Sequence, residues 1–406
     1  MTQVFSGMSD QGVRDVEPMT VNGRATDLSL LADRVMHRLP PRPVMVLDVP
    51  GNEQLRHMAT RNPLWKRKSI VDVGGVVTAV PAAPCDRLLA VEEIGPIERA
   101  VHDVLVTGLF TAGPQVAEFE HALAGFHGAV SAVGTASGTD ALVVALHAVG
   151  VGRGDDVVIP SNAPHATTNA VCLAGANPVI AEVGDDHLLH PESVRDVLTP
   201  STRCVVPIHL NGRAADVRSI SAVVAGTDVA IVEDGGQGIG LDGLGVWSDA
   251  VAVGFDVQKN LASCGRSGAV LTNRSDVAEL ARELSLDTPM DDVQAAALSA
   301  RLPYLALNNL RRSILALRYL DWLAPLADTG FITLPERVDN HVWNQFAVTQ
   351  DTRLAAHTGE TLAQRGVETS RSGNVLRLPM FPGLTITEQD HVVAALFSAA
   401  KTGPRG

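Results

Sequence analysis

Lys259 is the residue whose type and setting most directly suggest chemistry. The chain contains four lysines, and only Lys259 lies between two apolar runs typical of buried strands, within the stretch Asp249–Thr272. Loss of hydration disfavours an ammonium group, so a lysine at the end of a core strand offers a neutral amine that attacks carbonyl groups. The position predicts Schiff-base chemistry; the alternative is a side chain that extends from a strand end into water.

Asp234 and Gln237 lie in the stretch IVEDGGQG, just after an apolar run predicted to be a strand. A carboxylate at such a place is by itself explained as a helix cap. Together with Lys259 it has another use, because an acid beside a pyridine nitrogen keeps that nitrogen protonated and lets the ring accept electrons.

Ser137, Gly138 and Thr139 open a predicted helix in the stretch GTASGTDAL. Free backbone N–H groups, two hydroxyls and a glycine make a cradle for an anion, although Ser and Thr are also ordinary N-caps. Pyridoxal phosphate (PLP) needs an aldehyde-binding lysine, a phosphate cradle and a carboxylate for its ring nitrogen. The sequence offers all three, each after a predicted strand, so PLP is the expected cofactor.

The elements that must position these residues form an alternating pattern. Between residues 129 and 234, short β-rich runs alternate with helical patterns, which predicts an α/β fold with a mostly parallel sheet covered by helices on both faces. Ligands bind such sheets at the carboxyl ends of the strands. Two amphipathic helices are predicted before this region, and the chain is expected to divide into an extension of unknown role (1–88), a large cofactor-binding domain (89–322) and a small α+β domain (323–406).

The composition favours a compact protein that acts on small molecules. Of the 406 residues, 46% are hydrophobic and 19% are charged, and the net charge of −13 argues against nucleic acid or an anionic membrane as a partner. No segment has the length of a signal peptide core or a membrane span, which predicts a cytoplasmic protein. The widely spaced cysteines predict buried reduced thiols, with no metal site and no disulfide frame: Cys85, Cys172, Cys204 and Cys264.

From about Glu92 to Leu396 the sequence resembles the DegT/DnrJ/StrS-type PLP-dependent sugar aminotransferases of fold type I. The stretches that carry the resemblance occur in the order of that family: IGPIERAVHDVLVTG, GPQVAEFE, GTASGTDAL, GVGRGDDVVIPS, GANPVIAEV, LTPSTRCVVPIHLNG, IVEDGGQ, QKNL, GAVLTN, MDDVQAAAL, RGVET and LRLPMFPGL.

The resemblance implies a role for each matching residue. It makes Lys259 the Schiff-base lysine and proton carrier, Asp234 the partner of the pyridine nitrogen, and Gln237 the neighbour of the phenolic oxygen. It makes Ser137, Gly138 and Thr139 part of the phosphate cup. It also implies a homodimer that moves an amino group from an amino acid, with glutamate or glutamine as the expected donor, to a keto sugar or cyclitol in amino-sugar or antibiotic biosynthesis.

The sequence departs from the family pattern at several positions. Gly254 replaces a phosphate-binding serine, Asp287 replaces an asparagine directed at the neighbouring subunit's phosphate, and Pro164 replaces a ring-stacking aromatic residue. The adjacent His165 is the candidate to stack on the ring instead, with a locally hydrogen-bonded histidine as the alternative.

The substrate-facing segment is also short here. It is reduced to SRSGNV, so Arg371 or Arg377 is either a contact for an anionic substrate or a solvated charge.

Two other functions fit the same residues. The departures at the cofactor site fit a family member that has lost catalysis and acts as a dimeric helper. A PLP-dependent sugar dehydratase is a lesser alternative, because its relatives often replace the lysine that this chain keeps.

Overall fold

The structure, a computed structural model, describes residues 79–82, 87, 89–111 and 113–402. The rest of the predicted extension 1–88 lies outside the described residues. Val80 is fully buried and forms a parallel bridge with Val367, and Arg87 makes an ion pair of 2.7 Å with Glu388. These last residues of the predicted extension therefore pack against the C-terminal part of the chain.

A seven-stranded sheet, here called the large sheet, forms the centre of the described chain. Its strand order is β1-β7-β6-β5-β4-β2-β3, with parallel pairing from β6 to β3 and antiparallel pairing of β7 with both its neighbours. The predicted mostly parallel sheet is thus confirmed. The strands are β1 (Ser131–Thr135), β2 (Asp156–Pro160), β3 (Asn177–Ala181), β4 (Thr202–Val205), β5 (Ala230–Asp234), β6 (Ala250–Gly254) and β7 (Gly268–Thr272).

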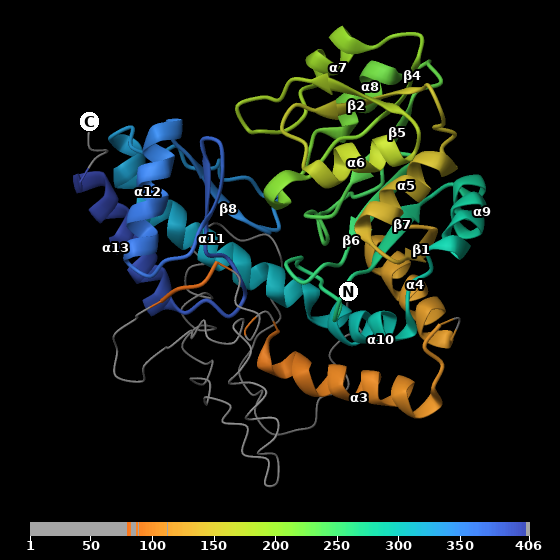
Figure 1. Cartoon of the computed structure of the whole chain (residues 1–406), viewed down its shortest axis with the longest axis horizontal. Helices are drawn as coiled ribbons and strands as arrows, with labels where there is room; N and C mark the ends of the chain where they lie inside the picture. The colour runs from red at the N-terminus through yellow and green to blue at the C-terminus, as the bar shows by residue number, and fades with distance from the viewer. Residues whose placement is uncertain (1–78, 83–86, 88, 112, 403–406) are drawn as a thin grey trace, which may run out of the picture. The chain divides into compact units, whose positions relative to one another are not determined.

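Helices cover both faces of the large sheet, as predicted (Figure 1). Because successive strand residues point to opposite faces, Val232 packs with α5 and α6 on one side while Ile231 packs with α7 and α8 on the other. The helices that pack on this sheet or beside it are α3 (Val91–Thr107), α4 (Pro114–His127), α5 (Gly138–Ala148), α6 (His165–Leu173), α7 (Pro191–Val197), α8 (Val217–Val224), α9 (Ser275–Leu284) and α10 (Asp292–Arg301).

A second sheet of three strands, here called the small sheet, lies in the C-terminal part. Its order is β8-β10-β9 and all its pairing is antiparallel. Leu376 and Leu378 of β10 are buried in a core shared with the flanking helices. The elements are β8 (Phe346–Thr349), α12 (Thr352–Gln364), β9 (Ser370–Ser372), β10 (Val375–Leu378) and α13 (Ile386–Thr402).

Helix α11 (Leu305–Asp328) runs from the neighbourhood of α10 to the helices of the small sheet (Figure 1). The predicted domain boundary after residue 322 falls inside this helix. The division into domains at 89–322 and 323–406 stays a prediction.

Two further observations concern predictions from composition. No helix in the described ranges is long and apolar enough to cross a membrane. Cys204 is buried, but Cys172 and Cys264 are exposed, so the prediction of buried thiols is wrong for these two. Cys172 lies on the exposed side of α6, and Cys264 lies in the loop between β6 and β7, so the core covers neither thiol.

Candidate active site

Lys259 lies in the loop that joins β6 to β7, and a network of amides fixes the loop around it. Its backbone N–H donates to the carbonyl of Asp256 at 2.8 Å. The next residue, Asn260, is buried and donates to Asn309 and to the carbonyl of Val342, both at 2.8 Å. The side chain of Asn344 donates to Asn260 at 2.9 Å. The lysine is therefore carried by a loop with little freedom to move.

Burial sets the electrostatics of Lys259. Desolvation lowers the pKa of its amine below the ordinary value, while the negative charges of Asp234 and Asp256 act in the opposite direction. The desolvation effect is the larger one, so the neutral, nucleophilic form of the amine is favoured relative to an exposed lysine. Lys259 is half-buried, and its role as the Schiff-base lysine stays a prediction.

Asp234 ends β5 and its carboxylate is held on both oxygens. Oδ2 accepts a hydrogen bond of 2.7 Å from the hydroxyl of Thr167, and Oδ1 accepts one of 3.1 Å from the N–H of Gly236. Thr167 is buried in the first turn of α6. Sequence reasoning missed this threonine, because a threonine in a first helical turn is unremarkable until the fold brings α6 against β5.

A second buried network braces the same strand from its other face. The carboxylate of Glu233 accepts hydrogen bonds from the Nε2 of His209 at 2.7 Å, from the hydroxyl of Ser248 and from the N–H of Gly245. The Nδ1 of His209 accepts from the N–H of Ala215 at 3.0 Å, so the proton of this imidazole lies on Nε2. These contacts fix the strand end from which Asp234 projects.

Gly236 shows how close Asp234 and Lys259 are. A Cβ built on this glycine would lie 3.2 Å from Oδ1 of Asp234 and 3.3 Å from Nζ of Lys259. The carboxylate and the amine thus border the same small space, which any side chain at position 236 would fill. This is the arrangement that a ring with an aldehyde and a basic nitrogen requires, so these residues fit PLP.

The start of α5 forms the predicted cradle. The N–H groups of Gly138 and Thr139 have no acceptor within the helix, because they belong to its first turn. A Cβ on Gly138 would lie only 2.8 Å from the Cα of Gly254, so the two backbones pack directly on each other. The hydroxyl of Ser137 is already used: it accepts from the N–H of Asp140 at 3.1 Å and donates to the carboxylate of Asp140 at 2.7 Å.

Two carboxylates lie close to this cradle. Asp140 sits in the first turn of α5, and Oδ2 of Asp256 lies 3.8 Å from the position that a Cβ would take on Gly254. The carboxylate of Asp256 has no hydrogen bond or ion pair to any described residue, although its backbone carbonyl accepts from Lys259. The free backbone N–H groups of the cradle fit a phosphate, whereas the negative charges of the two nearby carboxylates disfavour its binding.

The other predicted residues occupy different surroundings. Oε1 of Gln237 accepts a hydrogen bond of 2.5 Å from the N–H of Asn211, which has a φ of 59° and whose carbonyl accepts from the N–H of Gln345. His165 begins α6 and is exposed, and no contact joins it to Asp234, Gln237 or Lys259 in the described part of the chain. Its stacking role stays a prediction.

Two of the departures from the family pattern also have definite places. Pro164 is the N-cap of α6. Asp287 is exposed at the end of a 3-10 turn, next to Thr288, whose carbonyl accepts from the N–H of Ala136 beside the cradle at 2.8 Å.

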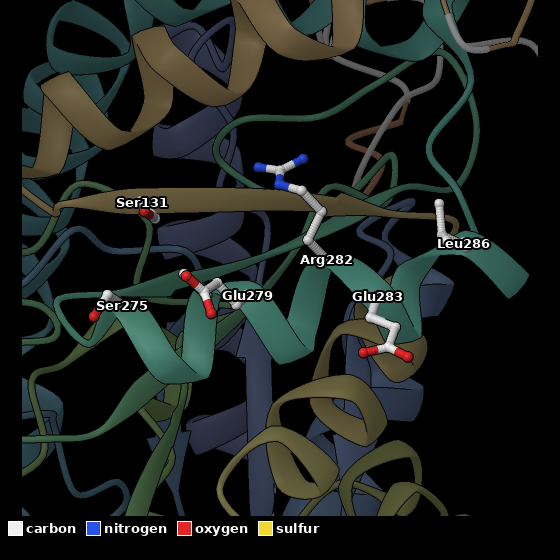
Figure 2. Close-up of a pocket in the computed structure, with 7 residues that line it drawn as sticks. Ser131, Ser275, Glu279, Arg282, Glu283 and Leu286 are labelled. Atoms are coloured by element: carbon white, nitrogen blue, oxygen red, sulfur yellow. The ribbon is translucent and has the colours of Figure 1, made fainter.

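A separate surface hollow lies along α9 and does not belong to this site (Figure 2). Its basic side chain, Arg282, already pairs with Glu120 at 2.9 Å and donates to the carbonyl of Ala132. The residues that line it are Ser131, Ser275, Ala278, Glu279, Arg282, Glu283 and Leu286.

His341 stabilises the segment that holds the Lys259 loop, and it makes that segment sensitive to acid. Its ring stacks on Trp343 with centroids 3.7 Å apart, and its Nδ1 accepts from the N–H of Trp343 at 3.0 Å. Burial, with a smaller effect of Arg213, lowers the pKa of His341 to about 3.

Because the unfolded histidine binds a proton from about pH 6.5 downward and the folded one does not, stability should fall as the pH drops from about 6.5 toward 3. At pH 5 this amounts to about 2 kcal/mol from His341. Urea unfolding at pH 7 and pH 5 measures it: His341→Gln should lose less stability over that interval than the wild type, whereas His121→Gln, which alters an exposed helical histidine, should behave like the wild type. Equal losses in all three proteins would contradict the assignment.

Comparisons with known proteins agree with this geometry. The family model described as the DegT/DnrJ/EryC1/StrS aminotransferase family matches residues 92–372. The 3-oxo-glucose-6-phosphate:glutamate aminotransferase of Bacillus subtilis is 32% identical over 413 residues, which cover 87% of this chain and 94% of that protein. The dTDP-3-amino-3,4,6-trideoxy-alpha-D-glucose transaminase of Streptomyces venezuelae is 35% identical over 307 residues, which cover 70% of this chain and 79% of the relative.

Solved structures show the same fold. The crystal structure of NtdA from Bacillus subtilis with bound cofactor PMP has a TM-score of 0.78 and 31% sequence identity, over 81% of this chain and 87% of that one. DesV of S. venezuelae has a TM-score of 0.71 and 30% identity, over 79% of this chain and 99% of that one. The chain therefore belongs to the DegT/DnrJ/EryC1/StrS aminotransferase family, as a PLP-dependent aminotransferase of fold type I.

Proposed function

We propose that the protein transfers an amino group from an amino acid, glutamate or glutamine, to a keto sugar or cyclitol in the biosynthesis of an amino sugar or an antibiotic. The observation that supports catalysis at this site most directly is the common space shared by Nζ of Lys259 and Oδ1 of Asp234 beside Gly236. The similarity to aminotransferases whose names specify oxo or amino sugars supports the acceptor class.

Each residue has a distinct task in this proposal. PLP, when bound, supplies an aldehyde that takes up the amino group and a ring that delocalises the electrons left when a proton departs from carbon. The amine of Lys259 removes a proton from the α-carbon of the donor and delivers a proton to the cofactor. In the second half-reaction it moves a proton in the opposite direction, from the cofactor to the acceptor. Asp234 holds a proton on the ring nitrogen, and Thr167 and the N–H of Gly236 orient its carboxylate.

The remaining cofactor contacts belong to the same proposal. Gln237 faces the phenolic oxygen, and its hydrogen bond from Asn211 fixes the direction of its amide. The backbone N–H groups of Gly138 and Thr139 bind the phosphate, with Ser137 shaping the helix start through its N-cap bond. His165 is retained as the candidate for stacking on the ring.

Two half-reactions test this function. Purified protein loaded with PLP should lose its visible absorbance on addition of glutamate or glutamine, with release of the corresponding oxo acid, and a keto sugar should restore the absorbance and yield an amino sugar. A protein that binds no PLP would favour the non-catalytic helper. A protein that binds PLP and eliminates water from a sugar without consuming a donor would favour the dehydratase.

Asp256 should weaken the binding of the cofactor's phosphate. Its carboxylate lies beside the cradle and repels a second anion, so Asp256→Asn should tighten PLP binding by about tenfold. Pyridoxal, which lacks the phosphate, is the internal control: Asp256→Asn also removes a charge that favours the ammonium of Lys259, and because this effect is common to both compounds, the affinity for pyridoxal should change less than that for PLP. Spectroscopic titration of both compounds against both proteins measures the difference, and an equal effect on PLP and pyridoxal would show that Asp256 acts elsewhere.

We also propose that the protein is a homodimer. The turn that adjoins the cradle exposes Leu286, which is 74% accessible, and the end of α3 exposes Val106, which is 71% accessible. The resemblance to this aminotransferase family implies a dimer, and exposed apolar side chains of this kind are available for a contiguous contact with a second subunit. Light scattering should give twice the mass of the chain, and a single-chain mass at micromolar concentration would contradict this.

A further inference from the structure

Arg377 is a cation without a counter-ion among the described residues. It lies on β10 and is half-buried, and among the arginines of the described residues that are at least partly buried it alone has no hydrogen bond, ion pair or ring contact. The partly or fully buried arginines that pack beside the small sheet are paired: Arg87 with Glu388, Arg318 with Asp390, and Arg312 with the carbonyl of Met380. A guanidinium withdrawn from water normally has an anionic partner.

The face of the small sheet on which Arg377 lies is opposite to its core. Leu376 and Leu378 are buried in the core, so the alternation of strand residues places Arg377 on the other face. Arg377 is in register with Ala347 of β8. By the same alternation, Ala347 shares this face with Gln345 and Thr349.

Both ends of this face contact loops of the candidate active site. At one end, the N–H of Gln345 donates to the carbonyl of Asn211, whose own N–H donates to Gln237. At the other end, the hydroxyl of Thr349 lies 3.1 Å from Nε2 of His187, whose carbonyl accepts from Asn162 at 2.8 Å.

Asn162 lies in the loop between β2 and α6, the helix that supplies Thr167 to Asp234. Ala347 stands between these two ends, one strand alternation of about 7 Å from each. Arg377 therefore lies at the middle of a face that is bounded on both sides by cofactor-site loops.

We propose that Arg377 binds an anionic group of a substrate, either the carboxylate of the amino donor or a phosphate on the acceptor sugar. This rests on the proposed function. The planar guanidinium offers two parallel N–H groups to a carboxylate or a phosphate, which both accept them through two oxygens. Burial also lowers the pKa of Arg377, and no neighbouring charge opposes that effect.

The neighbouring strand provides a matched control. Arg371 on β9 is in register with Leu376 of the same sheet, but it is exposed and donates to the carbonyl of Gly373 at 3.0 Å. Its guanidinium is solvated and already hydrogen-bonded, so we do not expect it to bind an anion of the substrate. Arg371→Gln and Arg377→Gln remove the same charge from the same small sheet and should differ only in substrate binding.

The experiment uses PLP-loaded protein and two probes, glutarate for the donor and inorganic phosphate for the sugar phosphate. Isothermal titration should show that Arg377→Gln weakens one probe by about 10- to 100-fold, the loss of a charge-assisted bidentate pair, while Arg371→Gln binds both like the wild type. Loss of glutarate binding identifies the donor carboxylate, and loss of phosphate binding identifies the acceptor. Arg377→Lys, which keeps the charge without the fork, should recover part of the affinity.

Thermal unfolding separates this role from a structural one. Because Arg377 has no partner in the described chain, Arg377→Gln should not lower the melting temperature, and the visible absorbance of bound PLP should be unchanged. Unaltered binding of both probes in Arg377→Gln, or no binding of either probe by the wild type, would overturn the inference. Failure of the proposed function is distinct, since the wild type would then either lack PLP absorbance or release no oxo acid from glutamate or glutamine.

Discussion

Replacing Lys259 by alanine should reduce transamination by about 10⁴-fold or more, because the change removes both the nucleophile and the group that moves the proton. The fold should survive the change: burial disfavours the ammonium of Lys259, so its removal should not lower the melting temperature. Steady-state assays with glutamate and a keto sugar measure the loss. Reductive trapping followed by peptide mass mapping should find PLP attached at position 259 in the wild type only.

Lys401 supplies the control for this experiment. It lies exposed in the last turn of α13, and Lys401→Ala should leave activity and PLP attachment unchanged. If Lys259→Ala retained activity within tenfold of the wild type, or if PLP were attached elsewhere, Lys259 would not be the reacting amine.

Asp234→Asn should have the second largest effect, a fall in kcat of about 10²- to 10⁴-fold. The amide keeps the size of the side chain but loses the charge that holds a proton on the ring nitrogen, so the electrons released at the α-carbon are less well accommodated. The fall should be in kcat more than in KM, because the lost interaction is strongest in the transition state. Rapid-mixing measurements of the donor half-reaction isolate this step.

Two other variants show whether the carboxylate itself is responsible. Thr167→Val removes the hydrogen bond of 2.7 Å to Oδ2 but leaves the charge, so its effect should be roughly tenfold or less. Asp321→Asn alters an exposed acid of α11 and should have no effect. A wild-type rate in Asp234→Asn would exclude a role for this acid at the ring nitrogen.

The sequence was sufficient to predict the framework of the site. Strands alternating with helices imply parallel strands, and polar residues after such strands gather at one edge of a sheet, which is why Asp234 and Lys259 could be expected to meet. The resemblance to known aminotransferases gave Gln237 and the start of α5 from contiguous stretches. These features depend on local pattern and on chain order, both of which are visible in a sequence.

The contacts that tune the site could not be foreseen in the same way. Thr167 reaches Asp234 only because α6 packs against β5. Arg377 differs from Arg371 in its face of the small sheet, its burial and its lack of a hydrogen-bond partner among the described residues. The position of Asp256 beside the cradle depends on the path of the loop after Gly254. Each of these contacts is between segments that tertiary packing brings together. No periodic pattern in the sequence indicates such a contact.

The antiparallel pairing of β6 with β7 has a consequence for the energetics of ligand capture. Gly254 and Gly268 are partners in register, so the segment bearing Lys259 is closed at its base by the sheet itself. Closing a flexible segment lowers its conformational entropy, and here that entropy is lost when the chain folds, before any ligand binds. Vitamin B6 therefore binds to a preorganised loop, so little of its binding free energy is spent on ordering that loop.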